Sequence, residues 1–208
     1  MSVSTTTFPA QLDRLVELGY PGLVGLDEPA FRDLLAPLEP LAPSAPDAAG
    51  RVPFVLVVTR KLVDPYATVP LLRLAGGDRP GVVDRNHADG DLVTYHPLPE
   101  LGVPDAGAYL LLDVERGEEF CGVRPEDALP VISRRGRTPL TIDEGIALVT
   151  QVPQLLEKNR CFMLSGSRRQ DRRVPAMWIS ERAPKLGWCW DGNPHSWLGV
   201  ASVRARVC

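Results

Sequence analysis

Apolar residues recur at helical spacing in the first forty residues of the chain. In residues 8–18 they fall on one face of a helix, and Thr7 stands where it can cap the first turn. A second segment of the same kind follows Asp27, another residue type that caps helices well. The pattern therefore predicts a helical hairpin within residues 1–39.

Two continuous apolar runs, at residues 53–59 and 108–114, are rich in branched side chains. Runs of this kind are typical of strands that are covered on both faces. Residues 64–107 between them contain many prolines and glycines, which leave room only for short strands. An Arg-Gly turn follows the second run, so we expect residues 118–122 to return as its hairpin partner.

The second half of the chain predicts two more helices and then a series of strands. Residues 125–133 begin with proline and two acids, which favour the first turn of a helix. Thr141 and Glu144 have the spacing of a capping box, which opens a helix to about residue 150. Four apolar runs then alternate with turns and indicate an antiparallel meander: residues 161–164, 174–180, 186–190 and 197–203.

These elements together predict an α+β fold, with an N-terminal helical hairpin, a mostly antiparallel sheet and two or three helices covering it. Residues 40–52 are rich in proline, alanine and serine, a composition typical of linkers. We therefore expect a helical hairpin at residues 1–39, a linker at 40–52 whose residues 40–50 are exposed and mobile, and an α+β domain at 53–208.

The length of 208 residues and the apolar fraction of 44% suit a globular chain that buries its own core. The net charge of −3 divides unevenly, because residues 1–123 carry 9 basic and 18 acidic side chains while residues 124–208 carry 14 and 8. This asymmetry favours either an anionic partner for the second half, or two halves that pack together and complement each other.

The first residues lack the basic start and apolar run of a signal peptide, and no apolar stretch approaches the ~20 residues of a membrane span. The four cysteines show no CxxC spacing, which favours reduced thiols in a cytoplasmic protein. We expect no membrane partner. The overall acidity and the missing basic-aromatic motif also argue against a nucleic-acid partner.

Several short segments resemble those of one protein family. They are YLLLDVERG at 109–117, RPEDALP at 124–130, GRTPLTIDEG at 136–145, GSR at 166–168, DRRVPA at 171–176, GWCW at 187–190 and NPH at 193–195. These segments resemble an actinobacterial domain family of unknown function, over roughly residues 53–203. The resemblance implies a small cytosolic protein of actinobacterial type. It implies no activity, so no catalytic residue is carried over.

The segment GSRRQDRR at residues 166–173, the arginine loop, places four arginines in six positions between two predicted strands. Guanidinium groups bind carboxylates and phosphates bidentately, and Gly166 would let backbone N–H groups approach an anion. A second arginine cluster at residues 134–137 would converge on it. The alternative is a solvated loop that Asp171 partly neutralises. The candidate ligand-binding residues are Ser167, Arg168, Arg169, Arg172 and Arg173.

All four tryptophans lie in the last 31 residues. On a strand, Trp188 and Trp190 share one face and Cys189 takes the other. The functional interpretation is that these two indoles stack on a ring, a sugar or a base of a ligand. The alternative is an ordinary core of the closing sheet.

A thiol site is a further hypothesis, with Cys161, Cys189 and His195 as candidate catalytic residues. An imidazole can activate a neighbouring thiol as a nucleophile, and the three side chains can also serve as zinc ligands. The alternative is that both thiols are buried core residues. Five further residues favour either a hard-metal site or a solvated loop: His87, His96, Asp84, Asp89 and Asp91.

The sequence lacks the glycine-rich phosphate loops, the HExxH motif and the GxSxG motif. The leading hypothesis is an accessory module that binds a small anionic ligand or a protein partner through the arginine loop and the Trp-rich strands. One alternative is a small thiol-dependent transferase or hydrolase that uses Cys161 or Cys189 with His195. The other is a purely structural or interaction module. We expect no metal site, and the sequence leaves the cofactor and the oligomeric state open.

Overall fold

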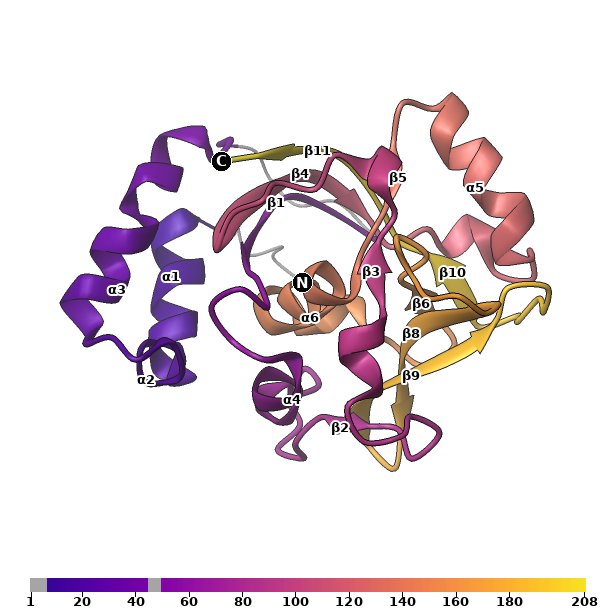
Figure 1. Ribbon diagram of the computed structural model, residues 1–208, viewed down its shortest axis with the longest axis horizontal. Coiled ribbons are helices and arrows are strands. Elements are labelled where there is room, and N and C mark those ends of the chain that lie inside the picture. Colours follow the sequence, from indigo (N-terminus) through magenta and orange to yellow (C-terminus); the bar gives the residue numbers. More distant parts are fainter. Residues whose placement is uncertain (1–6, 45–49) are drawn as a thin grey trace.

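The structure, a computed structural model, describes residues 7–44 and 50–208 as an α+β fold with two sheets (Figure 1). The first sheet has the antiparallel order β1 (Arg51–Val58), β4 (Ala108–Glu115), β11 (Ser202–Val207) and β5 (Thr138–Pro139). The second has the order β10 (Leu198–Val200), β6 (Cys161–Met163), β8 (Arg173–Ser180), β9 (Ala183–Trp190) and β2 (Val82–Val83), with parallel pairs at its two edges. A short ladder pairs β3 (His96–Pro97) with β7 (Ser167–Arg168).

Helices and short 3-10 turns surround the two sheets. The α-helices are α1 (Phe8–Glu17), α2 (Tyr20–Val24), α3 (Glu28–Leu35), α4 (Pro65–Thr68), α5 (Pro125–Arg134) and α6 (Ile142–Gln151). The 3-10 turns are η1 (Ala36–Leu41), η2 (Val69–Leu71), η3 (Asp91–Thr94), η4 (Pro99–Leu101), η5 (Glu118–Phe120) and η6 (Pro153–Leu155). None of the described helices combines the length and the apolar character that a membrane span needs.

Strand β1 is covered on both faces, as its continuous apolar run predicts. Val55 and Val57 belong to the main core, which they share with α6 and with the second sheet. Phe54 and Leu56 belong to a second core, formed with α1 and α3. Figure 1 shows α6 at the centre of the molecule and α1 and α3 beside the first sheet. Helix α6 is buried almost all round, which is typical of a core helix.

The predicted caps are confirmed. Thr7 accepts a hydrogen bond from the N–H of Ala10, and Asp27 accepts one from the N–H of Ala30. The capping box of Thr141 and Glu144 is also formed. The structure contains one more helix in this region than predicted, because the short helix α2 lies between α1 and α3. Glycines with positive φ stand immediately before and after α2, so a five-residue helix fits where the sequence suggested only a turn.

The division into a hairpin at 1–39, a linker at 40–52 and a domain at 53–208 stays a prediction. Residues 45–49, within the expected linker, and residues 1–6 lie outside the described residues. What the structure describes is a shared core, because Phe8, Leu12 and Leu15 of α1 pack in one cluster with residues of β1 and β4.

The predicted strand at 118–122 is wrong. This segment forms η5, and Phe120 is buried against α5 in a small cluster with Ala128 and Ile132. Gly117 precedes η5 with a positive φ of 71°, and a side chain at this position would overlap the carbonyl of Val200. Residues 118–122 therefore bury Phe120 beneath α5, and they do not pair with β4 as a strand.

The predicted single strand at 197–203 is also wrong, because the segment divides between the two sheets. β10 pairs in parallel with β6, and β11 pairs antiparallel with β4. Ala201 connects them, and its carbonyl accepts a hydrogen bond from the N–H of Leu140 at 3.0 Å. Every residue from 198 to 203 is buried, so the sequence pattern gives no mark of the crossing. The closing strands are therefore not a simple meander.

A buried network, the Glu144 cluster, holds the start of α6 against the first sheet. It consists of Glu144, Arg206, Tyr109 and Thr141. Glu144 accepts hydrogen bonds from Arg206 Nε at 2.5 Å, from the Tyr109 hydroxyl at 2.7 Å and from the N–H of Thr141 at 2.7 Å. Arg206 also donates to the Thr138 hydroxyl at 2.6 Å. Burial and the neighbouring carboxylate raise the pKa of Tyr109, which keeps its hydroxyl a donor.

Candidate functional site

One cavity, which we call the arginine cavity, has a volume of about 730 Å³. The β3–β7 ladder forms one wall, since it pairs His96 with Arg168 and Pro97 with Ser167. The next residue, Leu98, continues this wall by donating its N–H to the carbonyl of Gly166 at 2.9 Å. The lining residues are Val93, Thr94, His96, Pro97, Leu98, Pro99, Arg168, Arg169 and Gln170.

Two predicted binding residues, Arg168 and Arg169, line this cavity, and carboxylates fix both. Arg168 Nη2 lies 3.0 Å from Asp191 Oδ1, and its Nε donates to the carbonyl of Ser165 at 3.1 Å. Arg169 pairs with Asp91, and its Nε lies 3.2 Å from Asp171 Oδ2. Within residues 7–44 and 50–208, Arg168 Nη1 has no hydrogen-bond partner, so this guanidinium retains donors for a further acceptor.

The other arginines of the arginine loop lie elsewhere. Arg172 is exposed and pairs with Glu126 of α5 at 2.6 Å. Arg173 stacks over the ring of Trp188, with its guanidinium carbon 4.5 Å from the ring centre. The second cluster does not converge on the loop, since its members pair locally: Arg135 with Glu119 at 2.5 Å, and Arg137 with Asp113 at 2.9 Å.

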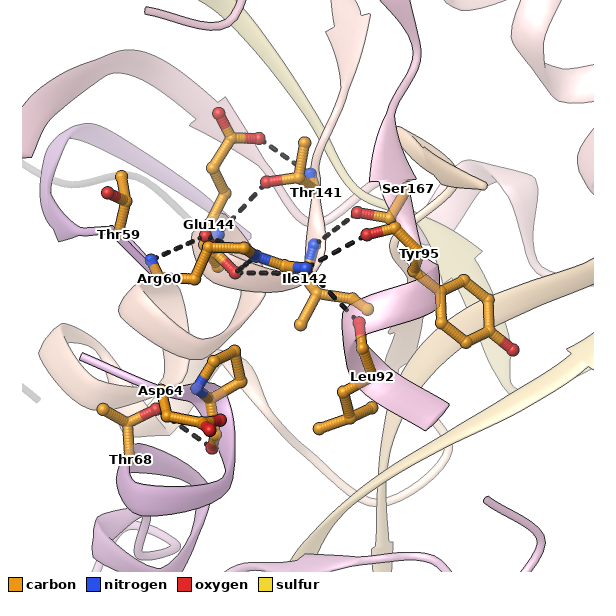
Figure 2. A network of polar contacts seen from close by, with 12 residues as sticks. Thr59, Arg60, Asp64, Thr68, Leu92, Tyr95, Thr141, Ile142, Glu144 and Ser167 are labelled. Atoms are coloured by element: carbon orange, nitrogen blue, oxygen red, sulfur yellow. Dashed lines mark hydrogen bonds and ion pairs between the residues drawn. The ribbon is translucent and has the colours of Figure 1, made fainter. Parts of the chain in front are cut away.

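Ser167 and Gly166 connect β7 to the start of α6. The buried Ser167 hydroxyl accepts a hydrogen bond from the N–H of Ile142 at 2.9 Å, which Figure 2 shows. The N–H of Gly166 donates to the carbonyl of Leu140 at 2.8 Å, so it is not available to an anion as the sequence suggested. Gly166 is required for close packing, because a Cβ here would lie 2.6 Å from the carbonyl oxygen of Pro139.

Behind the arginine cavity lies a group of ionisable side chains that we call the Asp91 cluster. It consists of His87, Asp91, Tyr95, Arg169 and Arg173. His87 Nδ1 lies 3.2 Å from Asp91 Oδ2, and the His87 and Tyr95 rings meet edge to face at 5.8 Å. The guanidinium of Arg169 lies over the Tyr95 ring at 5.5 Å. Asp91 therefore joins a buried histidine to an arginine that lines the cavity.

Burial and hydrogen bonding act in opposite directions in the Asp91 cluster. Burial lowers the pKa of His87, because it disfavours the charged imidazolium. Burial also works against the charge of Asp91, but hydrogen bonds from Arg169 and His87 outweigh it and lower the Asp91 pKa. Burial raises the pKa of Tyr95 to about 12. Among the described residues, His87 Nε2, Tyr95 Oη and Arg173 Nε are buried without a hydrogen-bond partner.

A network that sequence reasoning missed fixes the wall of the arginine cavity. Arg60 Nη2 lies 2.7 Å from Asp143 Oδ1, and Arg60 Nη1 donates to the carbonyl of Tyr95 at 3.0 Å (Figure 2). Because Asp143 is in the first turn of α6, this pair ties η3 to the central helix. Arg60 and Asp143 are 83 residues apart, so no local pattern marks the pair. Both residues also line a smaller cavity of about 320 Å³.

The tryptophans form two pairs on opposite faces of the β8–β9 hairpin. As predicted, Trp188 and Trp190 share one face, where their rings meet at 5.0 Å and Trp190 is 45% exposed. Trp178 points to the other face and meets Trp197 edge to face at 6.3 Å. This second pair lines a cavity of about 470 Å³. The sequence singled out the first pair because of its i, i+2 spacing.

The two candidate thiols lie in surroundings that raise their pKa. Cys161 is buried and donates to the carbonyl of Glu157 at 3.4 Å, and burial raises its pKa. Burial raises the pKa of Cys189 to about 11. His195 lies 5.5 Å from the Trp197 ring, and in the described part of the chain it makes no hydrogen bond to either thiol. A nucleophilic cysteine needs a lowered pKa, which is the opposite shift.

The described residues also contain no group of three or more His, Cys, Asp or Glu side chains placed to hold a metal ion. This applies to the zinc set of Cys161, Cys189 and His195. It applies equally to the set of acids around His87 and His96.

The fold and the cavities together define an α+β protein in which two arginines, each paired with a carboxylate, line a cavity of about 730 Å³. Residues 14–208 match the model of a family of unknown function, DUF5701, and the chain belongs to that family. This confirms the resemblance to a family of unknown function that the sequence segments indicated. Comparison with the curated proteins and with the solved structures gave no match.

Proposed function

We propose that this protein is an accessory module that binds a small anionic molecule in the arginine cavity, with Arg168 and Arg169 as its binding residues. The observation that carries the proposal is the position of these two guanidinium groups in the wall of a cavity of about 730 Å³. This volume lies within the range of about 300–1,000 Å³ typical of small-molecule sites.

The fixed orientation of the arginines supports this function. Asp191 holds Arg168 and Asp91 holds Arg169, so little side-chain entropy is lost when a ligand oxygen joins them. The same carboxylates neutralise part of the positive charge. A ligand must therefore place an acceptor atom where the remaining N–H groups of the arginines can donate to it. Negative charge alone is not sufficient for binding.

The apolar part of the lining defines the rest of the ligand. Val93, Leu98 and two prolines face the cavity together with the arginines. A carboxylate or phosphate that carries an apolar portion matches this combination. We extend the proposal to a cytoplasmic protein of actinobacterial type with reduced thiols. All four cysteines are free, in keeping with this extension.

The proposal is tested by thermal melting in phosphate or sulfate, at ionic strength held constant with sodium chloride. The wild type should melt about 3–6 °C higher at ten times the dissociation constant. Arg168→Ala should abolish this rise. Arg172→Ala is the matched control, since Arg172 belongs to the same loop but pairs with Glu126 away from the cavity.

Asp191→Asn sharpens the test, because it removes the carboxylate that competes for Arg168. We expect this variant to show a larger anion-dependent rise than the wild type. A wild type that shows no rise up to tens of millimolar anion contradicts the proposal. An equal loss in Arg168→Ala and Arg172→Ala contradicts it as well.

A further inference from the structure

The cavity lined by Trp178 and Trp197, the tryptophan cavity, is separate from the arginine cavity and shares no lining residue with it. It has a volume of about 470 Å³ and lies at the strands β6 and β8 and the turn before β6. Its lining residues are Lys158, Asn159, Cys161, Trp178, Ile179, Ser180 and Trp197.

The aromatic walls of this cavity are fixed in place. Trp178 lies across Gly187 of the neighbouring strand, where any side chain would overlap the indole ring. The lack of a side chain at Gly187 thus lets the ring rest directly on the backbone of β9. The Trp197 ring stands at 79° to the Trp178 ring, and its centre lies 5.5 Å from that of the His195 ring.

Two indoles at nearly a right angle present different surfaces to one ligand. A planar ring that stacks on the face of one indole meets the other indole through its edge, and both arrangements are favourable for aromatic pairs. The floor contributes Cys161, which is buried and whose own contact is to the carbonyl of Glu157. The interior therefore favours an apolar, flat group.

The rim of the cavity supplies one positive charge. Lys158 lies in a turn closed by the bridge between Glu157 and Arg160. The other two lysines pair with carboxylates, Lys61 with Asp105 and Lys185 with Asp84. Lys158 has no such partner among the described residues, and the adjacent Glu157 is engaged by Arg116 at 3.1 Å and by Arg160 at 3.7 Å. The ammonium group of Lys158 is thus available to an anion.

We propose that the tryptophan cavity binds a small planar aromatic carboxylate, with the ring packed into the angle that Trp178 and Trp197 form and the carboxylate at Lys158. The lysine disfavours a cationic ligand, which two indoles alone would otherwise attract. A neutral ring gains nothing from Lys158. The ligand class follows from the combination of flat apolar walls with one unpaired ammonium group.

Calorimetric titration of the full chain with 1-naphthoate tests this inference. We expect saturable binding, and weaker binding of cyclohexanecarboxylate, which has the charge without the planar ring. We also expect weaker binding of 1-naphthalenemethanol, which has the ring without the charge. Lys158→Met should lower the affinity for 1-naphthoate about 2- to 5-fold.

Lys61→Met is the matched control, because Lys61 pairs with Asp105 and does not line the tryptophan cavity, so the affinity of this variant should equal that of the wild type. Trp197→Leu should abolish binding, and its near-UV circular dichroism reports whether the fold is kept. If Trp197→Leu does not fold, the exposed Lys158→Met variant still decides the matter. The inference is overturned if 1-naphthoate does not bind at millimolar concentration, or if both lysine variants bind it equally well.

Arg168→Ala separates this inference from the proposed function. It should leave the binding of 1-naphthoate unchanged, since Arg168 lines only the arginine cavity. Loss of 1-naphthoate binding in Arg168→Ala would place the ligand in the arginine cavity and overturn the inference.

Discussion

The Glu144 cluster and the Asp91 cluster are both buried groups of charges, but only the first is complete. Both oxygens of Glu144 accept hydrogen bonds, and Arg206 donates to three residues besides Glu144: Leu101, Thr138 and Pro139. In the Asp91 cluster, three buried polar atoms make no hydrogen bond among the described residues, although one of them, Arg173 Nε, lies 3.4 Å from Asp171 Oδ2. A buried polar atom that is left without any partner costs about 1–3 kcal/mol of stability.

This difference separates a structural cluster from a candidate functional one. The Glu144 cluster joins β4, β11 and α6, and none of its buried side-chain polar atoms lacks a hydrogen bond. The Asp91 cluster reaches the arginine cavity through Arg169, and three of its buried polar atoms make no hydrogen bond among the described residues. The completeness of a buried polar network is therefore a better guide here than the number of charges in it.

The largest expected effect comes from breaking the complete cluster. Glu144→Ala leaves the Arg206 guanidinium buried without its carboxylate, so the free energy of unfolding should fall by about 3–5 kcal/mol. Urea denaturation measures this loss. The double variant Glu144→Leu with Arg206→Met removes both charges and should lose less than the single variant. A double variant less stable than the single one would show that the charge pair itself contributes most of the stability.

A smaller effect is expected in the incomplete cluster. Asp91→Ala removes the carboxylate shared by His87 and Arg169, and the free energy of unfolding should fall by about 1–3 kcal/mol. The anion-dependent rise in melting temperature should also decrease, because Arg169 loses its support. Asp89→Ala is the control, since Asp89 is exposed and lies two residues away. A loss as large as that of Glu144→Ala would remove the distinction between the clusters.

The pH dependence of stability should be smaller still, and it should arise from His87. Its pKa is lowered below 6.5 by burial, so the unfolded chain binds a proton that the folded chain resists. Stability is therefore highest above pH 6.5 and falls as the pH is lowered toward 5. Urea midpoints at pH 7.5 and 5.5 measure the change.

His87→Gln should flatten this slope more than His195→Gln. The side chain of His87 is only 1% exposed, whereas His195 is partly exposed and its pKa is lowered by burial alone. An unchanged slope in His87→Gln would show that His87 does not resist protonation in the folded state.

The smallest effect concerns the thiols. With Cys208 replaced by Ser, Cys161 and Cys189 should alkylate slowly at neutral pH, because burial raises the pKa of each. Mass spectrometry identifies the labelled sites. His195→Ala should leave both rates unchanged. Fast labelling of either cysteine that slows in His195→Ala would make the thiol-dependent enzyme the leading hypothesis and would move the functional site away from the Asp91 cluster.

The fold was largely predictable wherever local chemistry decides it. Thr7, Asp27 and Thr141 marked three helix starts, because a cap depends on residues within one turn. The apolar run at β1 likewise predicted a strand covered on both faces. Local pattern failed at residues 198–203, where the chain passes from one sheet to the other and every residue is buried.

The sequence predicted some residues of the candidate site but not which side chains contact one another. The arginine loop was visible in the sequence, and two of its arginines do line the arginine cavity. The carboxylate that holds Arg169 lies 78 residues earlier, at Asp91, and no spacing rule connects the two. For the same reason the sequence pointed to Trp188 and Trp190, whereas the pair that lines a cavity joins Trp178 of β8 to Trp197 of a later loop.

The crossing of residues 198–207 between the sheets has a consequence for synthesis of the chain on the ribosome. β11 is an inner strand of the first sheet, so β5 has no neighbour and one edge of β4 stays open until residues 202–207 have emerged. Open strand edges invite pairing with other chains. We expect nascent chains that end before residue 202 to aggregate or to bind chaperones. Chains that continue past residue 207 into a linker should become protease-resistant, provided that the linker is long enough for residue 207 to leave the ribosomal exit tunnel.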